Sequence, residues 1–137
     1  QYRYLFGAVS VSNEYDAKSR ALMARLLVDK DLNLKSRMLV KIRFNKEVRN
    51  YCHEYKVEKP QDISVLVKSI EDDGKDVPVL VRQYMKLGGK FLSFCVDKEF
   101  NSTLDGLIIV DLASAPEKNL KMYMGDKMQA YLEHYKK

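Results

Sequence analysis

Four residues with binding chemistry lie within one short predicted helix, in the segment "VLVRQYMKLGGK". Arg82 and Lys86 are four residues apart, so their cationic groups share one face of a helix. Two cations one turn apart can hold a carboxylate or a phosphate, with Arg as the bidentate member. Gln83 and Tyr84 add an amide and a phenol. The residues alone also fit, and favour, an amphipathic surface helix whose charges are solvated.

Acidic residues follow this helix. Asp97, Glu99 and Asp105 flank a predicted turn between two strands. A carboxylate can act as a general base or bind an amine, so Asp97 is a candidate catalytic base. Acidic residues in turns more often cap backbone amides, and that structural interpretation is favoured. Asp111 lies in an apolar strand, where it needs a partner if it is buried, or else ends the strand in contact with water.

The Cys and His residues do not have the spacing of a metal site. Cys52 and Cys95 are far apart, and His53 and His134 form no HxxxH pattern. We therefore expect no metal and two unreactive thiols, as in a reducing compartment. The "LGGK" segment lacks the rest of a P-loop and follows a helix, so we expect a helix C-cap there instead of a phosphate loop.

The excess positive charge is concentrated in the first part of the chain. The net charge is +5, and residues 1–58 hold 12 Lys and Arg against 7 Asp and Glu, whereas residues 59–137 hold 12 of each. The densest basic cluster consists of Lys35, Arg37, Lys41, Arg43, Lys46 and Arg49. Such a cluster can attract an anionic membrane or an acidic protein, and can equally be a solvated face. No nucleic-acid recognition motif accompanies it, so we expect no nucleic-acid partner.

Hydrophobic periodicity predicts an α/β or α+β domain with three strands, at 2–12, 91–96 and 107–112. The first strand is apolar on both faces and is expected in the interior of a sheet. The other two are separated by too few residues for a helical crossover, so we pair them antiparallel. Three strands make a thin sheet, and further strands are expected upstream or from another chain.

Four helices are predicted between and after the strands. They cover 16–28, a segment opened by Pro60, 79–87 before Gly88 and Gly89, and a segment opened by Pro116 with Gly125 as its weak point. Residues 29–59 are the least regular, with a short strand expected at 38–44 and a helical turn at 49–55.

Two segments of the chain resemble a known family. They are "QYRYLFGAVSVSNEYDAKSRALM" and "DGKDVPVLVRQYMKLGGKFLSFCVDKEFNSTLDGLIIVDL". Together they resemble the C-terminal half of bacterial GNAT-like N-acyltransferases, which are often labelled hemolysins and are similar to ornithine- and glycine-lipid synthases. The resemblance is weak across 30–58. It also departs from the family at "SFCVDKEF", where the family is closer to "GFNVDPDF", so Cys95 does not reproduce the polar contact of an Asn.

The resemblance implies that residues 1–137 are a single partial domain, the C-terminal half of a GNAT-like fold. That half would have a small mixed sheet, a C-terminal antiparallel hairpin and flanking helices. The first strand would be the fifth of the fold, beside the acyl-donor cleft, with the fourth strand and the phosphate-cradling loop preceding Gln1. The implied activity is the transfer of a fatty acyl chain to an amine acceptor in membrane lipid biosynthesis. The donor substrate would be an acyl-carrier-protein or CoA thioester, with no tightly bound cofactor.

In this family interpretation Arg82 and Lys86 hold the acceptor carboxylate, while Tyr84 and Phe94 line an acyl groove. The basic cluster would dock the acidic acyl carrier protein. Further expected partners are an anionic membrane surface and the missing N-terminal half or a fused glycerolipid acyltransferase domain. The expected location is cytoplasmic, peripheral at the inner face of the membrane. The alternative is a non-catalytic basic module that binds a membrane surface or an acidic partner protein.

Overall fold

The computed structural model describes residues 2–29, 45–54 and 60–135, which form helices and one antiparallel sheet. The strands are β1 (Tyr4–Val11), β2 (Lys90–Asp97) and β3 (Thr103–Asp111). The helices are α1 (Ala17–Leu26), α2 (Lys46–Glu54), α3 (Pro60–Ile70), α4 (Val79–Lys86), α5 (Glu117–Met124) and α6 (Lys127–Tyr135), with a 3-10 turn η1 (Leu112–Ser114) after β3. The predicted α+β class and antiparallel hairpin are confirmed. A parallel contact also occurs, as an isolated bridge between Val28 and Phe91.

Strand β3 is the centre of the sheet, and it pairs antiparallel with β1 on one side and with β2 on the other. The prediction that the first strand is interior is therefore wrong, because β1 is an edge of the described sheet. Apolar residues on both faces of β1 do not reflect burial on both faces. Tyr4, Leu5 and Phe6 keep 50%, 45% and 79% of their surface exposed, so apolar side chains here do not imply burial.

The turn between β2 and β3 is shorter than the predicted ten-residue connection, because residues 103–106 extend β3. Asp97 holds this turn: its Oδ1 accepts hydrogen bonds from the backbone N–H groups of Glu99 at 2.9 Å and Phe100 at 3.0 Å. Asn101 and Ser102 then take positive φ angles of 51° and 53°, which reverse the chain within a few residues.

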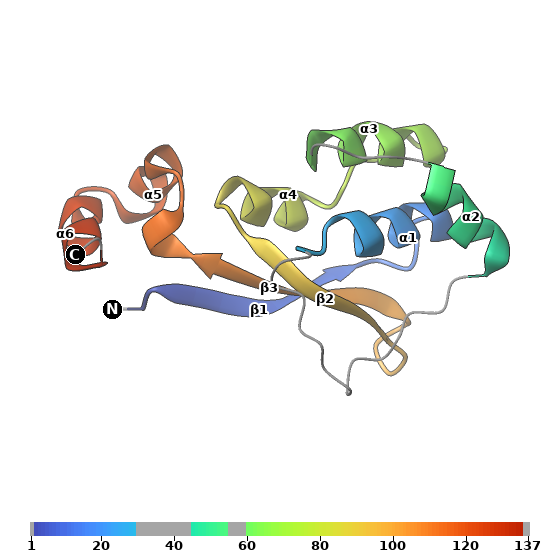
Figure 1. Cartoon of the computed structure of the whole chain (residues 1–137), viewed down its shortest axis with the longest axis horizontal. Coiled ribbons are helices and arrows are strands. Elements are labelled where there is room, and N and C mark those ends of the chain that lie inside the picture. The colour runs from blue at the N-terminus through green and yellow to red at the C-terminus, as the bar shows by residue number, and fades with distance from the viewer. Residues whose placement is uncertain (1, 30–44, 55–59, 136–137) are drawn as a thin grey trace.

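Helices α1 and α4 lie over one face of the sheet, and α3 packs on α1 farther from the strands (Figure 1). The core between these layers contains Val9, Val11, Met23, Ile63, Val67, Val81, Phe91, Phe94, Leu104 and Ile108. The rings of Phe91 and Phe94 stack with their centroids 4.9 Å apart. In the described part of the chain, no helix combines the length and the apolar character needed to cross a bilayer.

The twin glycine after α4 is a helix C-cap, as predicted. Gly89 N–H donates to the Tyr84 carbonyl at 2.8 Å, and Gly88 N–H donates to the Met85 carbonyl at 3.0 Å. This pair of bonds is the Schellman motif, and Gly88 takes the positive φ of 78° that the motif requires. The segment is therefore a turn from helix into strand β2.

The last predicted helix is two helices instead of one. Gly125 has a φ of 56°, which ends α5 and redirects the chain into α6. Together with η1, the two helices enclose a small separate core of Ala115, Leu120, Tyr131 and Leu132 at the end of the sheet (Figure 1). The Tyr131 hydroxyl donates to the Tyr2 carbonyl at 3.0 Å, which ties this unit to the start of β1.

Substitution of Gly106 tests the packing of the sheet against its helices. A Cβ at this position would lie 2.6 Å from ring atoms of both Phe91 and Phe94, so Gly106→Ala should lower the free energy of unfolding by about 1–3 kcal/mol. Gly7→Ala is the matched control, because a Cβ there meets nothing within 4 Å. Urea unfolding of the two variants should separate them clearly. Equal midpoints would contradict the packing described here.

Candidate functional site

An apolar groove lies over the paired strands β1 and β3, beside helix α4. It has a volume of about 210 Å³ and is lined by Leu5, Phe6, Gly7, Ala8, Val9, Tyr84, Ile108 and Val110. Strands β1 and β3 form its floor, and helix α4 contributes Tyr84. Gly7 has no side chain, and nothing lies within 4 Å of where its Cβ would be, so the strand leaves space at this point.

The lining of this groove suits an apolar chain. Its side chains are aliphatic or aromatic, and the Tyr84 hydroxyl is the polar side-chain group among them. Phe6 and Leu5 remain exposed to solvent. Covering such exposed apolar surface is favourable by roughly 25 cal/mol per Å². The groove was missed in the sequence, because aliphatic residues in a strand predict core and not a site.

Tyr84 is in the position expected of a groove-lining residue, but Phe94 is not. Phe94 is 7% exposed and stacks on Phe91 inside the core. It is not among the residues that line the groove. Its side chain supports the helical layer, so the predicted contact between Phe94 and an acyl chain has no geometric support.

Arg82 contacts the loop before α4 and does not project freely. Its Nε donates to the Val77 carbonyl at 3.0 Å, and its Nη1 lies 3.6 Å from the Asp76 carboxylate. Lys86 lies one turn later, is exposed, and makes no ion pair with the described residues. The two cations therefore have different roles, and the structure does not show the predicted clamp of both around one anion.

Asp76 is the centre of this loop. Its Oδ2 lies 3.1 Å from Lys68 Nζ, and its Oδ1 accepts hydrogen bonds from the Ser64 hydroxyl and from the Val77 N–H. Burial acts to raise the pKa of Asp76, but the hydrogen bonds from Ser64, Lys68 and Val77 outweigh it, and the pKa lies below its ordinary value. The carboxylate is therefore ionised and committed to holding α3 and α4 together.

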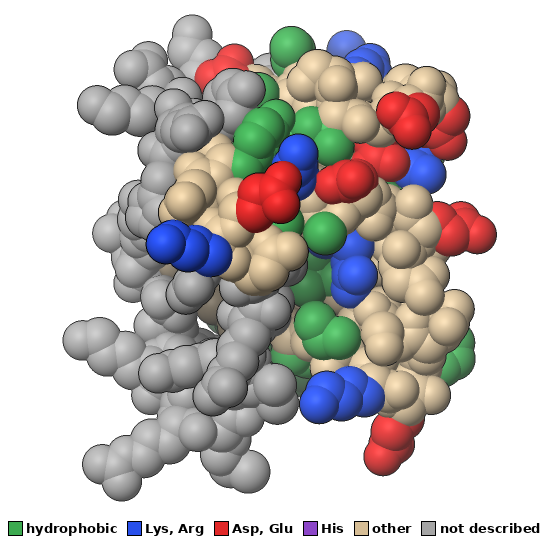
Figure 2. Space-filling model, turned by 90° about the vertical axis from the view of Figure 1, so that its right-hand side faces the viewer, with side chains coloured by type: hydrophobic (Ala, Val, Ile, Leu, Met, Phe, Trp, Pro, Cys, Tyr) green, Lys and Arg blue, Asp and Glu red, His purple; other side chains and the backbone are tan. Residues whose placement is uncertain are grey.

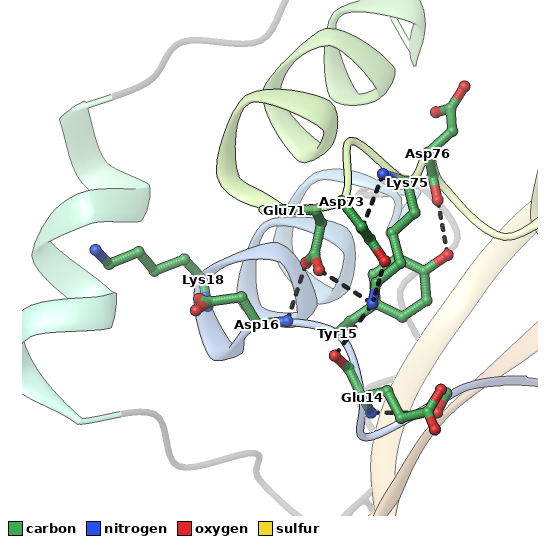
Figure 3. A network of polar contacts seen from close by, with 9 residues as sticks. Glu14, Tyr15, Asp16, Lys18, Glu71, Asp73, Lys75 and Asp76 are labelled. Atoms are coloured by element: carbon green, nitrogen blue, oxygen red, sulfur yellow. Dashed lines mark hydrogen bonds and ion pairs between the residues drawn. The ribbon is translucent and has the colours of Figure 1, made fainter.

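A second group of contacts links this loop to the start of α1 (Figure 3). The buried Glu71 accepts a hydrogen bond from the Asp16 N–H at 2.9 Å and pairs with Lys75 at 3.4 Å. The Tyr15 hydroxyl donates to the Asp76 carbonyl at 2.7 Å. Lys75 Nζ lies 5.0 Å from the centroid of the Tyr15 ring. No local sequence pattern predicts these contacts, because the two partners in each lie about 60 residues apart.

The acidic residues of the hairpin have structural contacts. Asp97 caps the β2–β3 turn, so its role as a catalytic base gains no support from the geometry. Asp105 accepts a hydrogen bond from the Thr103 hydroxyl at 3.2 Å. Asp111 has the partner that its position required: Arg3 binds it with two hydrogen bonds of 3.0 and 2.9 Å. These bonds from Arg3 hold the pKa of Asp111 below its ordinary value.

Most of the predicted docking cluster lies outside the described residues. This part comprises Lys35, Arg37, Lys41 and Arg43, and the predicted strand 38–44 lies outside them too. Lys46 and Arg49 belong to α2, and Lys46 is exposed. On the face drawn in Figure 2, described basic and acidic side chains lie next to one another. The docking surface stays a prediction.

Cys95 has a free thiol that is partly buried in β2. Burial raises its pKa, and the negative charges of Asp105 and Asp97 act in the same direction. A thiol with a raised pKa is a poor nucleophile at neutral pH. Among the described residues, no group of three or more His, Cys, Asp or Glu is arranged to hold a metal ion.

Comparison with known proteins returned no match to a family model, to a curated protein or to a solved structure.

Replacing each cation of α4 in turn tests their different roles. Arg82→Ala removes the bond to Val77 and one ion pair of Asp76, so the free energy of unfolding should fall by about 1 kcal/mol. Lys86→Ala removes an exposed side chain that has no ion pair with the described part of the chain, so the change should stay within about 0.5 kcal/mol. Thermal or urea unfolding measures both. A larger loss from Lys86→Ala would reverse the assignment.

The lowered pKa of Asp76 predicts a pH dependence. A carboxyl group with a lower pKa in the folded state stabilises the fold above its unfolded pKa of about 4, and this stability is lost as the pH falls through the folded pKa. Asp76→Asn should therefore cost stability at pH 7, with the deficit shrinking as the pH is lowered toward about 3. Asp126→Asn, at an exposed position, is the control. A deficit that does not change with pH would exclude the ionic role.

Proposed function

We propose that this chain is the C-terminal part of a GNAT-like acyltransferase. The enzyme transfers a fatty acyl chain from an acyl-carrier-protein or CoA thioester to an amine in membrane lipid biosynthesis. In the reaction the amine nitrogen attacks the thioester carbonyl, the C–N bond forms, the C–S bond breaks, and the amine loses a proton. The thiol leaves with the carrier.

The groove beside β1 is the observation that carries the proposal. In the family that the sequence resembles, the donor cleft lies on the outer side of the strand equivalent to β1. Here β1 is the edge of the described sheet, and an apolar groove lies over β1 and its neighbour β3. The space at Gly7 and the ring of Tyr84 suit an extended acyl chain lying along the strand.

The proposal assigns roles to fewer residues than the sequence suggested. Tyr84 lines the acyl groove, and Arg82 acts as a positioning residue that fixes the start of α4 through Val77. No base is assigned to take the amine proton, because the Asp97 carboxylate caps a turn. The phosphate-cradling loop of the donor site is proposed to lie outside these 137 residues.

A side chain that fills the groove should prevent an acyl chain from binding there. A palmitoyl-pantetheine probe with a diazirine in its acyl chain should label residues along the groove on irradiation, as mapped by mass spectrometry. Gly7→Val places a side chain in the open space and should reduce this labelling at least about fivefold.

Ser10→Val is the matched control, because Ser10 lies on the same strand outside the groove. It should label like the parent chain. Labelling that is spread over the surface, or that is equal in both variants, would remove the acyl-binding role of the groove.

The chain by itself should form no amide, because the donor phosphate loop is proposed to lie elsewhere. Incubation with palmitoyl-CoA and a mixture of amino acids and diamines, followed by mass spectrometry, provides the test. Turnover by the 137-residue chain would refute the half-domain proposal while leaving the acyl groove intact.

A further inference from the structure

A second cavity lies between the end of α4 and helix α5, and we propose that it binds a small carboxylate that carries an aryl or short alkyl group. Its volume is about 280 Å³, near the lower end of the roughly 300–1,000 Å³ typical of small-molecule sites. Its lining consists of Gln83, Lys86, Leu87, Asn119, Met122 and Tyr123. None of these residues lines the groove beside β1, so this proposal goes beyond the proposed function.

The walls of this cavity are held in place by hydrogen bonds to backbone carbonyls. The Schellman motif at Gly88 and Gly89 fixes the end of α4. The Asn119 side-chain amide donates to the Lys86 carbonyl, which joins α5 to α4. The side chains that line the cavity therefore come from two helices with a direct connection, and the site is formed before a ligand arrives.

Lys86 has a charge that the fold does not use. The last four carbonyls of α4, at Gln83, Tyr84, Met85 and Lys86, already accept hydrogen bonds from residues 87–89 and Asn119. The Lys86 ammonium is thus not needed to cap the helix, and it makes no ion pair with the described residues. A carboxylate in the cavity would supply the missing acceptor, with the Gln83 amide as a second donor.

The rest of the lining is apolar and poorly covered. Met122 and Tyr123 keep 68% and 60% of their surface exposed, although both border the cavity. Leu87, the C-cap residue of α4, is the third apolar residue of the lining. An aryl or alkyl group of the ligand would cover these side chains, and an aromatic ring would also gain from contact with Tyr123.

The charge of the lining selects against an amino acid. It contains one cation and no carboxylate, so an α-ammonium group would lie near Lys86 without an acidic partner. A simple carboxylate should therefore bind more tightly than the amino acid of the same shape. This preference separates the cavity from an acceptor site, which must take an amine.

Titration of the ¹⁵N-labelled chain with 3-phenylpropionate, followed by NMR, tests the proposal. We expect shift changes at Lys86, Asn119 and Tyr123, with binding at least about fivefold weaker for the neutral 3-phenylpropionamide and for phenylalanine. Equal affinity for the acid and the amide would overturn the role of the charge. Shift changes confined to the β1 groove, or absent at millimolar ligand, would overturn the site.

Two variants complete the test. Lys86→Gln keeps the length of the side chain and should lower the affinity for the acid to that of the amide. Lys127→Gln removes an exposed charge on α6, away from the cavity lining, and should leave the affinity unchanged. Unfolding curves for both variants confirm that they are folded. Loss of binding in both variants, or in neither, would refute the assignment to Lys86.

Discussion

The absence of a side chain at Gly106 is the constraint on which the sheet and its helical layer depend. Gly106 lies in the central strand, and a Cβ there would be 2.6 Å from the rings of Phe91 and Phe94. The two stacked rings therefore occupy the space over Gly106, within the core that the sheet shares with helices α1, α3 and α4. A side chain at this position would push the rings outward and separate the layers.

Gly7, in the edge strand, leaves open space, in contrast to the close packing at Gly106. At Gly106 the missing side chain is replaced by aromatic rings, whereas the space at Gly7 stays empty and becomes part of the groove. The difference arises from the position of each strand. Helix α4 contributes Val81 to the core and Tyr84 to the groove lining, and in the described structure the first residues of β1 stay exposed.

Local patterns predicted most helices and strands of the described part, because periodicity and capping residues act over a few positions, but not the break at Gly125 or the start of β3. The C-cap at Gly88 and the short helix before it are examples. The order of the strands was not predictable in this way, since an apolar strand looks the same at an edge and in the interior. The partner of Asp111 is likewise Arg3, 108 residues away, and no spacing rule connects them.

Helix α4 shows why residue types alone do not define the candidate site. Arg82 and Lys86 have the spacing of an anion clamp, but their neighbours differ. Arg82 lies beside Asp76 and the Val77 carbonyl, so its charge is used to hold the start of the helix. Lys86 lies where the helix carbonyls are already satisfied and borders a cavity instead. Arg82 secures the start of the helix, and Lys86 has no ion-pair partner among the described residues. The two binding contacts proposed for α4 therefore come from Lys86 and Tyr84, which line different cavities.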